Sequence, residues 1–347
     1  MEYSAKTKTE LKAICKERKI KGFSTCKDKD ALIALIRSAV PAQITETNTI
    51  QTSSPSPSPL PSLSPTEAKP LRQDIMEGDA LHILPTLESD TAQIILVDPP
   101  YNIGKDFGNN SDRQPMDEYL VWCDKWIKEC LRILKPNGTM FVYGFSEILA
   151  LILARIPHDV QRRWIVWHYT NKNVASLNFW QRSHESILVL WKSDKVFHRD
   201  DVREAYTEGF LNGAAGKERA ATEGRFQGKS GKKTTYKAHP NGALPRDVIK
   251  IPALAGGAGM NERVDHPTQK PLALCDKLIQ SCKQSDGYVL VPFAGSGSEC
   301  LAAKNRNLSF VGIELNPEYV KLIHERLREK ATEPSLPAAA TVPVVVQ

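Results

Sequence analysis

Residues 94–101 constrain the fold of this chain more than any other stretch. The run Ile-Ile-Leu-Val predicts a buried strand, and two prolines end it, because proline cannot donate a hydrogen bond to a neighbouring strand. The tetrad Asp98, Pro99, Pro100 and Tyr101 is therefore expected on the loop that follows the carboxyl end of a strand. In an open α/β sheet, ligands bind at this edge.

The tetrad contains the groups needed to hold an exocyclic amine. The Asp98 carboxylate and the Pro99 carbonyl can accept both amino hydrogens, while the face of Tyr101 can stack on the ring that bears the amine. For an isolated Asp-Pro-Pro-Tyr, a strand-ending turn with a capping acid is the simpler interpretation. The rest of the sequence decides between the two.

A glycine-rich turn is predicted near the other end of the chain. Residues 287–298, Gly-Tyr-Val-Leu-Val-Pro-Phe-Ala-Gly-Ser-Gly-Ser, indicate a strand that enters this turn, where Gly295 and Gly297 let the backbone approach a ligand. A second strand ends in Glu314, an acid placed to accept hydrogen bonds from a ribose diol. A structural turn would explain the glycines alone, but Glu314 and the tetrad together favour a nucleoside cofactor. The loop lacks the Lys-Ser/Thr pair of a phosphate-binding ATPase.

Strands and helices alternate through most of the chain, and this rhythm predicts βαβ units with a largely parallel sheet in an α/β, Rossmann-like fold. The segment Lys-Pro-Asn-Gly at 135–138 is expected to terminate a helix as a turn. The predicted elements are a helix at 116–134, strands at 139–143, 164–168 and 187–191, and a last helix that Asn316 and Pro317 cap and start.

The composition changes along the chain and indicates its division into parts. Residues 1–40 are basic and predict a helix-loop-helix, whereas the Ser- and Pro-rich residues 41–70 predict a disordered linker. Residues 71–332 form the large domain. Within it, residues 195–264 lose periodicity and gain glycine and lysine, which favours a target-recognition region. Residues 333–347 are rich in Pro and Ala and predict a disordered tail.

Charge and cysteine usage narrow the classes of function. The net charge of +6 and the pI of about 8.8 favour a polyanionic partner. The sequence contains neither a stretch that could cross a bilayer nor a signal peptide, so a soluble, intracellular protein is expected. Seven cysteines without a Cys-x-x-Cys argue against zinc and disulfides. Cys123 with Cys130, and Cys275 with Cys282, share helix faces and are expected in the core.

The basic amino-terminal part resembles a known DNA-binding module. Residues 10–24, Glu-Leu-Lys-Ala-Ile-Cys-Lys-Glu-Arg-Lys-Ile-Lys-Gly-Phe-Ser, together with Ala31-Leu32-Ile33, resemble the SAP module, a helix-loop-helix that binds DNA. Residues 1–40 hold ten basic and five acidic side chains, and this excess could follow a phosphate backbone. A solvated hairpin that makes protein contacts is the alternative.

The large domain resembles the β-class amino-group DNA methyltransferases, which carry Asp-Pro-Pro-Tyr as the catalytic motif and Phe-x-Gly-x-Gly at the S-adenosylmethionine site. In that family the catalytic part, the target-recognition part and the cofactor loop follow one another in the order found here. Further matches are Gly78-Asp79-Ala80-Leu81, Leu134-Lys-Pro-Asn-Gly138, Arg182-Ser-His-Glu185, His266-Pro-Thr-Gln-Lys-Pro271 and Gly312-Ile-Glu-Leu-Asn-Pro-Glu-Tyr319.

The resemblance implies a Rossmann-like methyltransferase fold with permuted motif order and N6-adenine methylation of double-stranded DNA in a restriction-modification setting. It implies Asp98, Pro99, Pro100 and Tyr101 as catalytic residues. It assigns the S-adenosylmethionine site to Asp79, Lys270, Phe293, Ala294, Gly295, Ser296, Gly297, Glu314 and Asn316. No metal is implied, and a homodimer and a cognate restriction endonuclease remain open as partners.

One departure from the family pattern is Val291, which stands where the family usually has an acid before Pro-Phe-Ala-Gly-Ser-Gly. This change removes an expected partner for the methionine end of the cofactor. Asp at the first tetrad position favours adenine, but N4-cytosine methylation is the near alternative. Enzymes that methylate RNA or protein amides usually have Asn there. A non-catalytic DNA-binding protein with a degenerate methyltransferase fold is the remaining alternative.

Overall fold

The computed structural model describes residues 71–105, 112–171, 177–213, 218–220, 233–235 and 238–328, with scattered positions between 7 and 36. The chain divides into two compact units, Met1–Glu67 and Ala68–Gln347. The predicted linker and tail, 41–70 and 333–347, lie outside the described residues, as does most of the basic stretch within 195–264.

The described positions of the first unit form a small apolar core. It consists of Leu11, Cys15, Leu32, Ile33 and Ile36, all buried against one another. These are positions that the helical spacing of the sequence selected for two packed helices. Whether this unit binds DNA, as the SAP-like sequence predicts, stays a prediction.

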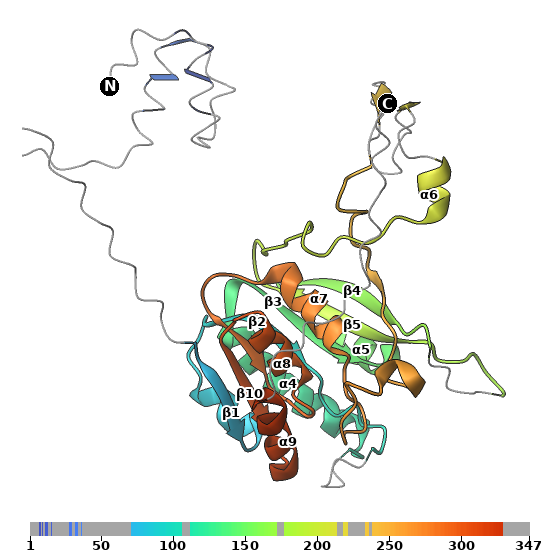
Figure 1. Cartoon of the computed structure of the whole chain (residues 1–347). Helices are drawn as coiled ribbons and strands as arrows, with labels where there is room; N and C mark the ends of the chain where they lie inside the picture. Colours follow the sequence, from blue (N-terminus) through green and yellow to red (C-terminus); the bar gives the residue numbers. More distant parts are fainter. Residues whose placement is uncertain are drawn as a thin grey trace, which may run out of the picture. The chain divides into compact units, whose positions relative to one another are not determined.

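The second unit is built on an eight-stranded sheet with the order β1-β10-β9-β2-β3-β5-β4-β8 (Figure 1). Only β5 runs antiparallel to its two neighbours, so the prediction of a mostly parallel sheet is confirmed. The strands are β1 (Gln73–Glu77), β10 (Phe310–Glu314), β9 (Tyr288–Val291), β2 (Ala92–Val97), β3 (Leu134–Gly144), β5 (His184–Trp191), β4 (Gln161–His168) and β8 (Val248–Lys250). A separate antiparallel pair joins β6 (Glu218–Ala220) to β7 (Lys233–Thr235).

Helices cover both faces of this sheet. The described helices of this unit are α3 (Ala80–Ile83), η2 (Leu84–Thr86), α4 (Met116–Ile133), α5 (Ser146–Leu153), α6 (Glu208–Gly213), η3 (Gly256–Gly259), α7 (Leu272–Cys282), α8 (Ser298–Asn305) and α9 (Pro317–Arg328), of which α6 buries no residue. Ile95 and Val97 of β2 join the core of α3, α4 and α5, whereas Ile94 and Leu96 join the core of α7, α8 and α9. Because β2 is buried on both faces, its sequence from Ile94 to Val97 is continuously apolar rather than alternating.

The junction between α4 and β3 differs from the prediction. The segment 135–138 was expected to be a turn before a strand at 139, but β3 already begins at Leu134, whose backbone is extended. Leu134 pairs with Ala92 and Thr139 with Ile94, so the residues between them form a bulge. A Cβ on Gly138 would lie 2.9 Å from the Gln93 carbonyl oxygen, which explains the glycine. The residues that were predicted to form a turn therefore form a bulge within β3.

The helical cysteines pack in the two cores, as their spacing predicted. Cys123 and Cys130 belong to the core beneath α4, and Cys275 and Cys282 belong to the core beneath α7. All four are free and almost completely buried. Burial raises the pKa of the Cys123 thiol to about 12, so this side chain acts as a small apolar residue.

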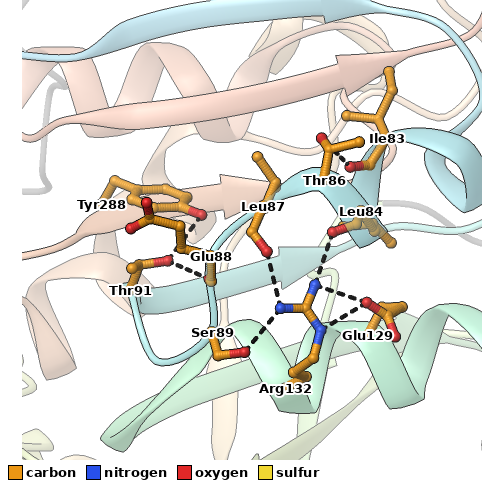
Figure 2. Close-up of polar contacts among 10 residues, drawn as sticks. All are labelled: Ile83, Leu84, Thr86, Leu87, Glu88, Ser89, Thr91, Glu129, Arg132 and Tyr288. Atoms are coloured by element: carbon orange, nitrogen blue, oxygen red, sulfur yellow. Dashed lines mark hydrogen bonds and ion pairs between the residues drawn. The ribbon is translucent and has the colours of Figure 1, made fainter.

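Arg132 fixes the loop that leads into β2 (Figure 2). Its guanidinium donates hydrogen bonds to the Leu84 and Leu87 carbonyl oxygens, at 3.0 and 2.9 Å. It also donates to the Ser89 hydroxyl and the Glu129 carboxylate, at 2.9 and 2.8 Å. The Leu87 carbonyl follows the last residue of η2, whereas the Leu84 carbonyl also accepts a hydrogen bond from the Leu87 N–H group. Arg132 therefore anchors the entry to the strand that carries the Asp98 tetrad.

We expect Arg132→Ala to lower the free energy of unfolding by about 2–3 kcal/mol, because two partly buried carbonyls lose a charged donor. Urea denaturation followed by circular dichroism measures this change. The control is Arg155→Ala, which removes an exposed ion pair with Asp124 and should cost less than about 1 kcal/mol. Equal losses in the two variants would show that the carbonyl contacts contribute nothing.

Candidate active site

The tetrad and the glycine loop meet because their strands are neighbours. Ile94 of β2 pairs with Val289 of β9, and the two strands run parallel, so their carboxyl ends lie at the same edge of the sheet. The two loops line one cavity of about 300 Å³. The predicted site residues in its lining are Asp79, Asp98, Pro99, Pro100, Tyr101, Lys270, Phe293, Ala294, Gly295, Ser296, Glu314 and Asn316. Gly297 does not line it and instead caps the start of α8.

Both carboxylate oxygens of Asp98 have partners at the base of this cavity. The Lys270 ammonium lies 2.7 Å from Oδ2, and the Tyr101 hydroxyl donates a hydrogen bond of 2.6 Å to Oδ1. Glu185 completes the cluster, with its Oε2 at 3.6 Å from Lys270 Nζ and 3.4 Å from Tyr101 Oη. Lys270 was predicted among the cofactor residues, whereas the structure places its ammonium beside Asp98 of the tetrad.

Burial and the neighbouring charges together determine the protonation states of Lys270 and Tyr101 in this cluster. Burial lowers the pKa of the Lys270 ammonium, but the Asp98 and Glu185 carboxylates more than offset it, so the net pKa is raised. Burial and the same two carboxylates raise the pKa of the Tyr101 phenol well above its usual value. Lys270 is therefore a permanent cation here, and Tyr101 is a neutral hydrogen-bond donor rather than a base.

The loop after the tetrad is held by its own polar groups. The Asp112 carboxylate accepts hydrogen bonds from the backbone N–H groups of Asn102, Ile103 and Lys105, at 2.5, 3.2 and 2.9 Å. The Tyr119 hydroxyl donates to the Pro100 carbonyl at 2.8 Å. Among the described residues, none donates a hydrogen bond to the Pro99 carbonyl, which lies in the cavity wall. The loop is thus rigid, and one of its acceptors is available to a ligand.

The second half of the cavity is organised by Glu314 at the end of β10. Its carboxylate accepts hydrogen bonds from the backbone N–H groups of Gly295 and Asn316, at 2.7 and 2.8 Å. Burial raises the pKa of this carboxyl, and the two N–H groups oppose that rise. The Glu314 carbonyl accepts from Gly78, which precedes Asp79, the cap of α3. Glu314 therefore links the glycine loop to the end of β1.

An aromatic wall closes one side of the same cavity. The Phe293 ring lies 5.5 Å from the Trp122 ring and 5.8 Å from the Trp126 ring, measured between centroids. Phe293 and Trp122 both face the cavity. A planar heterocycle could stack against this wall.

Two glycines in the loop cannot be replaced without displacing a neighbour. Gly295 has φ of 49°, and a Cβ there would lie 2.8 Å from Nε2 of His266. Gly297 has φ of 74°, and its Cβ would lie 2.9 Å from Ile323 of α9. Burial lowers the pKa of His266 to about 4, so a neutral imidazole packs against the loop at neutral pH. His266 and Ile323 thus occupy the space beside these two glycines, and close approach of the loop backbone to a ligand stays a prediction.

α9 holds the glycine loop from behind. The Arg326 guanidinium is buried and donates hydrogen bonds to the Ser296 carbonyl and the Ser298 hydroxyl, at 2.5 and 3.2 Å. The cap predicted for this helix is confirmed, because the Asn316 side chain accepts from the Glu318 N–H at 2.9 Å. Sequence reasoning did not identify Arg326, because an arginine in the last turn of a helix is commonplace.

Sequence reasoning also missed Glu299, which lines the cavity from the first turn of α8. Burial and the nearby Asp98 raise the pKa of its carboxyl from the model-peptide value of 4.5 to about 7, against the opposing effect of Lys270. The acid of Arg182-Ser-His-Glu185 was noted only as a motif match, although Glu185 contacts the cluster around Asp98. For both Glu299 and Glu185, the sequence shows an acidic residue but not the residues that surround it in the folded protein.

Comparisons with known proteins identify the family to which this chain is similar. The family model described as DNA methylase matches residues 92–325. The chain is 31% identical over 257 residues to the DNA adenine methyltransferase YhdJ of Escherichia coli, which covers 73% of this chain and 82% of that protein. It is 29% identical over 262 residues to the type II methyltransferase M.HpaI of Haemophilus parainfluenzae, which covers 74% of each.

A solved structure shares the fold. The PvuII DNA methyltransferase, described as cytosine-N4-specific, superposes with a TM-score of 0.53 at 15% identity, covering 74% of this chain and 87% of that one. This likeness concerns the fold alone. Among the described residues, no helix is long and apolar enough to cross a membrane, and no cluster of three or more His, Cys, Asp or Glu side chains could hold a metal ion.

We expect Glu299→Gln to stabilise the protein at pH 8. The folded-state pKa of Glu299 is raised to about 7, so its contribution to stability is complete below pH 4.5 and is lost as pH rises through 7. The variant should therefore gain on the order of 3 kcal/mol at pH 8 and less than about 1 kcal/mol at pH 5. Urea denaturation at the two pH values measures both differences.

The control for this measurement is Glu318→Gln, which removes an exposed carboxylate from the first turn of α9. It should change the free energy of unfolding by less than about 0.5 kcal/mol at either pH. If Glu299→Gln gains the same free energy at pH 5 and pH 8, Glu299 does not titrate in this range.

Proposed function

Because the chain belongs to the DNA methylase family, we propose that it transfers a methyl group from S-adenosylmethionine to N6 of adenine in double-stranded DNA. Family membership and its relatives make it an S-adenosylmethionine-dependent methyltransferase of exocyclic amino groups in DNA. We propose that adenine is the target base, and we propose the roles of the individual residues. The observation that carries it is the meeting of the Asp98 loop and the glycine loop in one cavity.

The residues around the cavity fit the proposed cofactor. Gly295 lines the cavity without a side chain, the Phe293 wall suits an adenine ring, and the Glu314 carboxylate suits a ribose diol. We assign the cofactor site to Asp79, Lys270, Phe293, Ala294, Gly295, Ser296, Gly297, Glu314 and Asn316. When bound, the cofactor supplies an electrophilic methyl group on sulfur.

The chain's part in the reaction begins with the target base. An amino group inside the duplex cannot reach the cavity, so the base must be flipped out of the stack. We assign the two amino hydrogens to the Asp98 carboxylate and the Pro99 carbonyl, and the face of the base to Tyr101. In the free protein the Tyr101 hydroxyl occupies Asp98 Oδ1. The incoming amino group takes over this acceptor, which releases the Tyr101 ring to lie against the base.

Asp98 then meets the positive charge that develops on the amino nitrogen as the new N–C bond forms. Its carboxylate is also placed to take the proton that the nitrogen loses. Lys270 lies on the other oxygen and orients the carboxylate. Since this cluster is buried, the interactions are stronger than they would be in water.

Adenine is favoured over cytosine by two observations. The tetrad begins with Asp98, and the family resemblance associates Asp with adenine and Ser more often with cytosine. A relative that is 31% identical over most of both chains is described as a DNA adenine methyltransferase. N4-methylation of cytosine is the second candidate.

The other parts of the chain are proposed to bring DNA to this site. The SAP-like residues 1–40 carry an excess of five basic side chains, and the segment 217–237 carries seven basic and two acidic residues. We propose the first as a DNA anchor and the region 195–264 as the target reader. The net charge of +6 supports contact with phosphates at both.

We expect Asp98→Asn to lower the methylation rate by at least about a hundredfold, because the neutral amide offers no charge to the developing cation. Transfer of a labelled methyl group to plasmid DNA measures the rate. Binding of S-adenosylhomocysteine, measured by calorimetry, should change only a few-fold. The control Asp286→Asn removes an exposed carboxylate beside Lys135 and should leave the rate unchanged. Full activity of Asp98→Asn would refute the role of Asp98.

Nucleoside mass spectrometry of DNA treated with the full chain and S-adenosylmethionine identifies the base. We expect N6-methyladenine. Detection of N4-methylcytosine would identify cytosine as the target base and would leave the proposed mechanism unchanged. Unmodified DNA, together with normal cofactor binding, would favour a non-catalytic DNA-binding protein.

A further inference from the structure

Glu299 is a buried acid whose place in the cavity the proposed mechanism leaves unexplained. It lies in the first turn of α8, its exposed fraction is 3%, and it lines the same cavity as Asp98 and the glycine loop. Its Oε1 is buried without a hydrogen-bond partner among the described residues, and it forms no ion pair with any of them. A buried carboxyl oxygen without a partner is rare and costly, so the site is built for a donor that the protein does not supply.

The groups around Glu299 provide only a weak donor, because the thiol of Cys275 is hydrogen-bonded to this carboxyl and Oε1 still has no partner among the described residues. Asp98 repels its charge, whereas the Lys270 ammonium attracts it but is engaged with Asp98 and Glu185. The uncharged groups that face Glu299 are the thiols of Cys275 on α7 and Cys300 on α8, and the phenol of Tyr143 on β3. A compact cation that enters the cavity would therefore find an acceptor with little competition.

The sequence around the glycine loop indicates which part of the cofactor would carry this cation. The family resemblance places an acid at the end of the strand before the loop, as a partner for the methionine end of the cofactor. This chain has Val291 there, and its side chain is completely buried. Glu299 follows the same loop after Gly297 and brings a carboxylate back into the cavity from the other side of the turn.

We propose that Glu299 binds the ammonium group at the amino-acid end of S-adenosylmethionine, and so supplies the carboxylate that Val291 lacks. This inference rests on the proposed function, since it concerns the same cofactor site. Glu299 is thus a cofactor-binding residue with no part in the transfer of the methyl group. Its cost to the stability of the free protein is offset when the ammonium arrives.

Binding should be coupled to the release of a proton. The pKa of Glu299 is about 7 in the free protein, raised by burial and by Asp98, so the carboxyl is partly protonated at neutral pH. An ammonium partner favours the ionised form and lowers this pKa. At pH 6.5 a group with a pKa near 7 that becomes fully ionised releases about 0.8 proton.

The test compares two ligands that share adenosine and a thioether. S-adenosylhomocysteine carries the amino-acid end, whereas 5′-methylthioadenosine lacks it. Calorimetric titration of the full chain should show that Glu299→Gln weakens S-adenosylhomocysteine about tenfold to a hundredfold, the range for a hydrogen bond to a charged group. The affinity for 5′-methylthioadenosine should stay the same, and Glu318→Gln should alter neither.

The outcomes separate this inference from the proposed function. If the wild-type chain binds neither ligand, the cofactor assignment itself fails. If it binds S-adenosylhomocysteine and Glu299→Gln binds it equally well, the role of Glu299 is overturned while the proposed function stands.

A second measurement needs no variant, and it decides the case in which Glu299→Gln weakens both ligands alike. Titration of the wild-type chain at pH 6.5 in two buffers with different ionisation enthalpies gives the number of protons released. S-adenosylhomocysteine should release about 0.8 proton more than 5′-methylthioadenosine. Equal release with the two ligands would overturn the inference.

Discussion

The pairing of β2 with β9 is the contact on which the site depends. Each strand ends in a loop whose conformation is fixed locally, by prolines after β2 and by glycines after β9. Neither loop forms a cavity alone. Because the strands are parallel neighbours in the middle of the sheet, both loops emerge at one edge, between helices that bury the strands on both faces. A shift in this pairing would separate the acid from the glycine loop.

Inside the cavity, the arrangement of charge matters as much as that of shape. Asp98 and Glu185 share one ammonium, that of Lys270, so this buried group carries more acid than base. Glu299 adds a further acid without adding a cation. This cluster therefore holds more acids than cations, and it suits a ligand that brings positive charge. The same imbalance connects the stability of the free protein with its affinity for the cofactor.

The sequence predicted what is encoded locally. The Asp98 loop, the glycine loop, the cap at Asn316 and the buried faces of the helices follow from residue types and their spacing. The meeting of Ile94 with Val289 could be expected only from the family resemblance, because no local pattern encodes a contact so distant in the chain. The start of β3 was mistaken because Lys-Pro-Asn-Gly signals a turn, and a bulge accommodates it. Glu299 was missed because acids are common in the first turn of a helix.

The strand order has a consequence for synthesis of the protein. β9 and β10 come from the carboxyl-terminal part of the chain, yet they lie between β1 and β2, which are made first. On the ribosome, β1 and β2 therefore emerge early with no neighbours to fill the space between them. The sheet closes only when residues 288–314 insert there, so the Asp98 loop is made before the strand that leads into the glycine loop. Catalytic competence is thus acquired as a late step of folding.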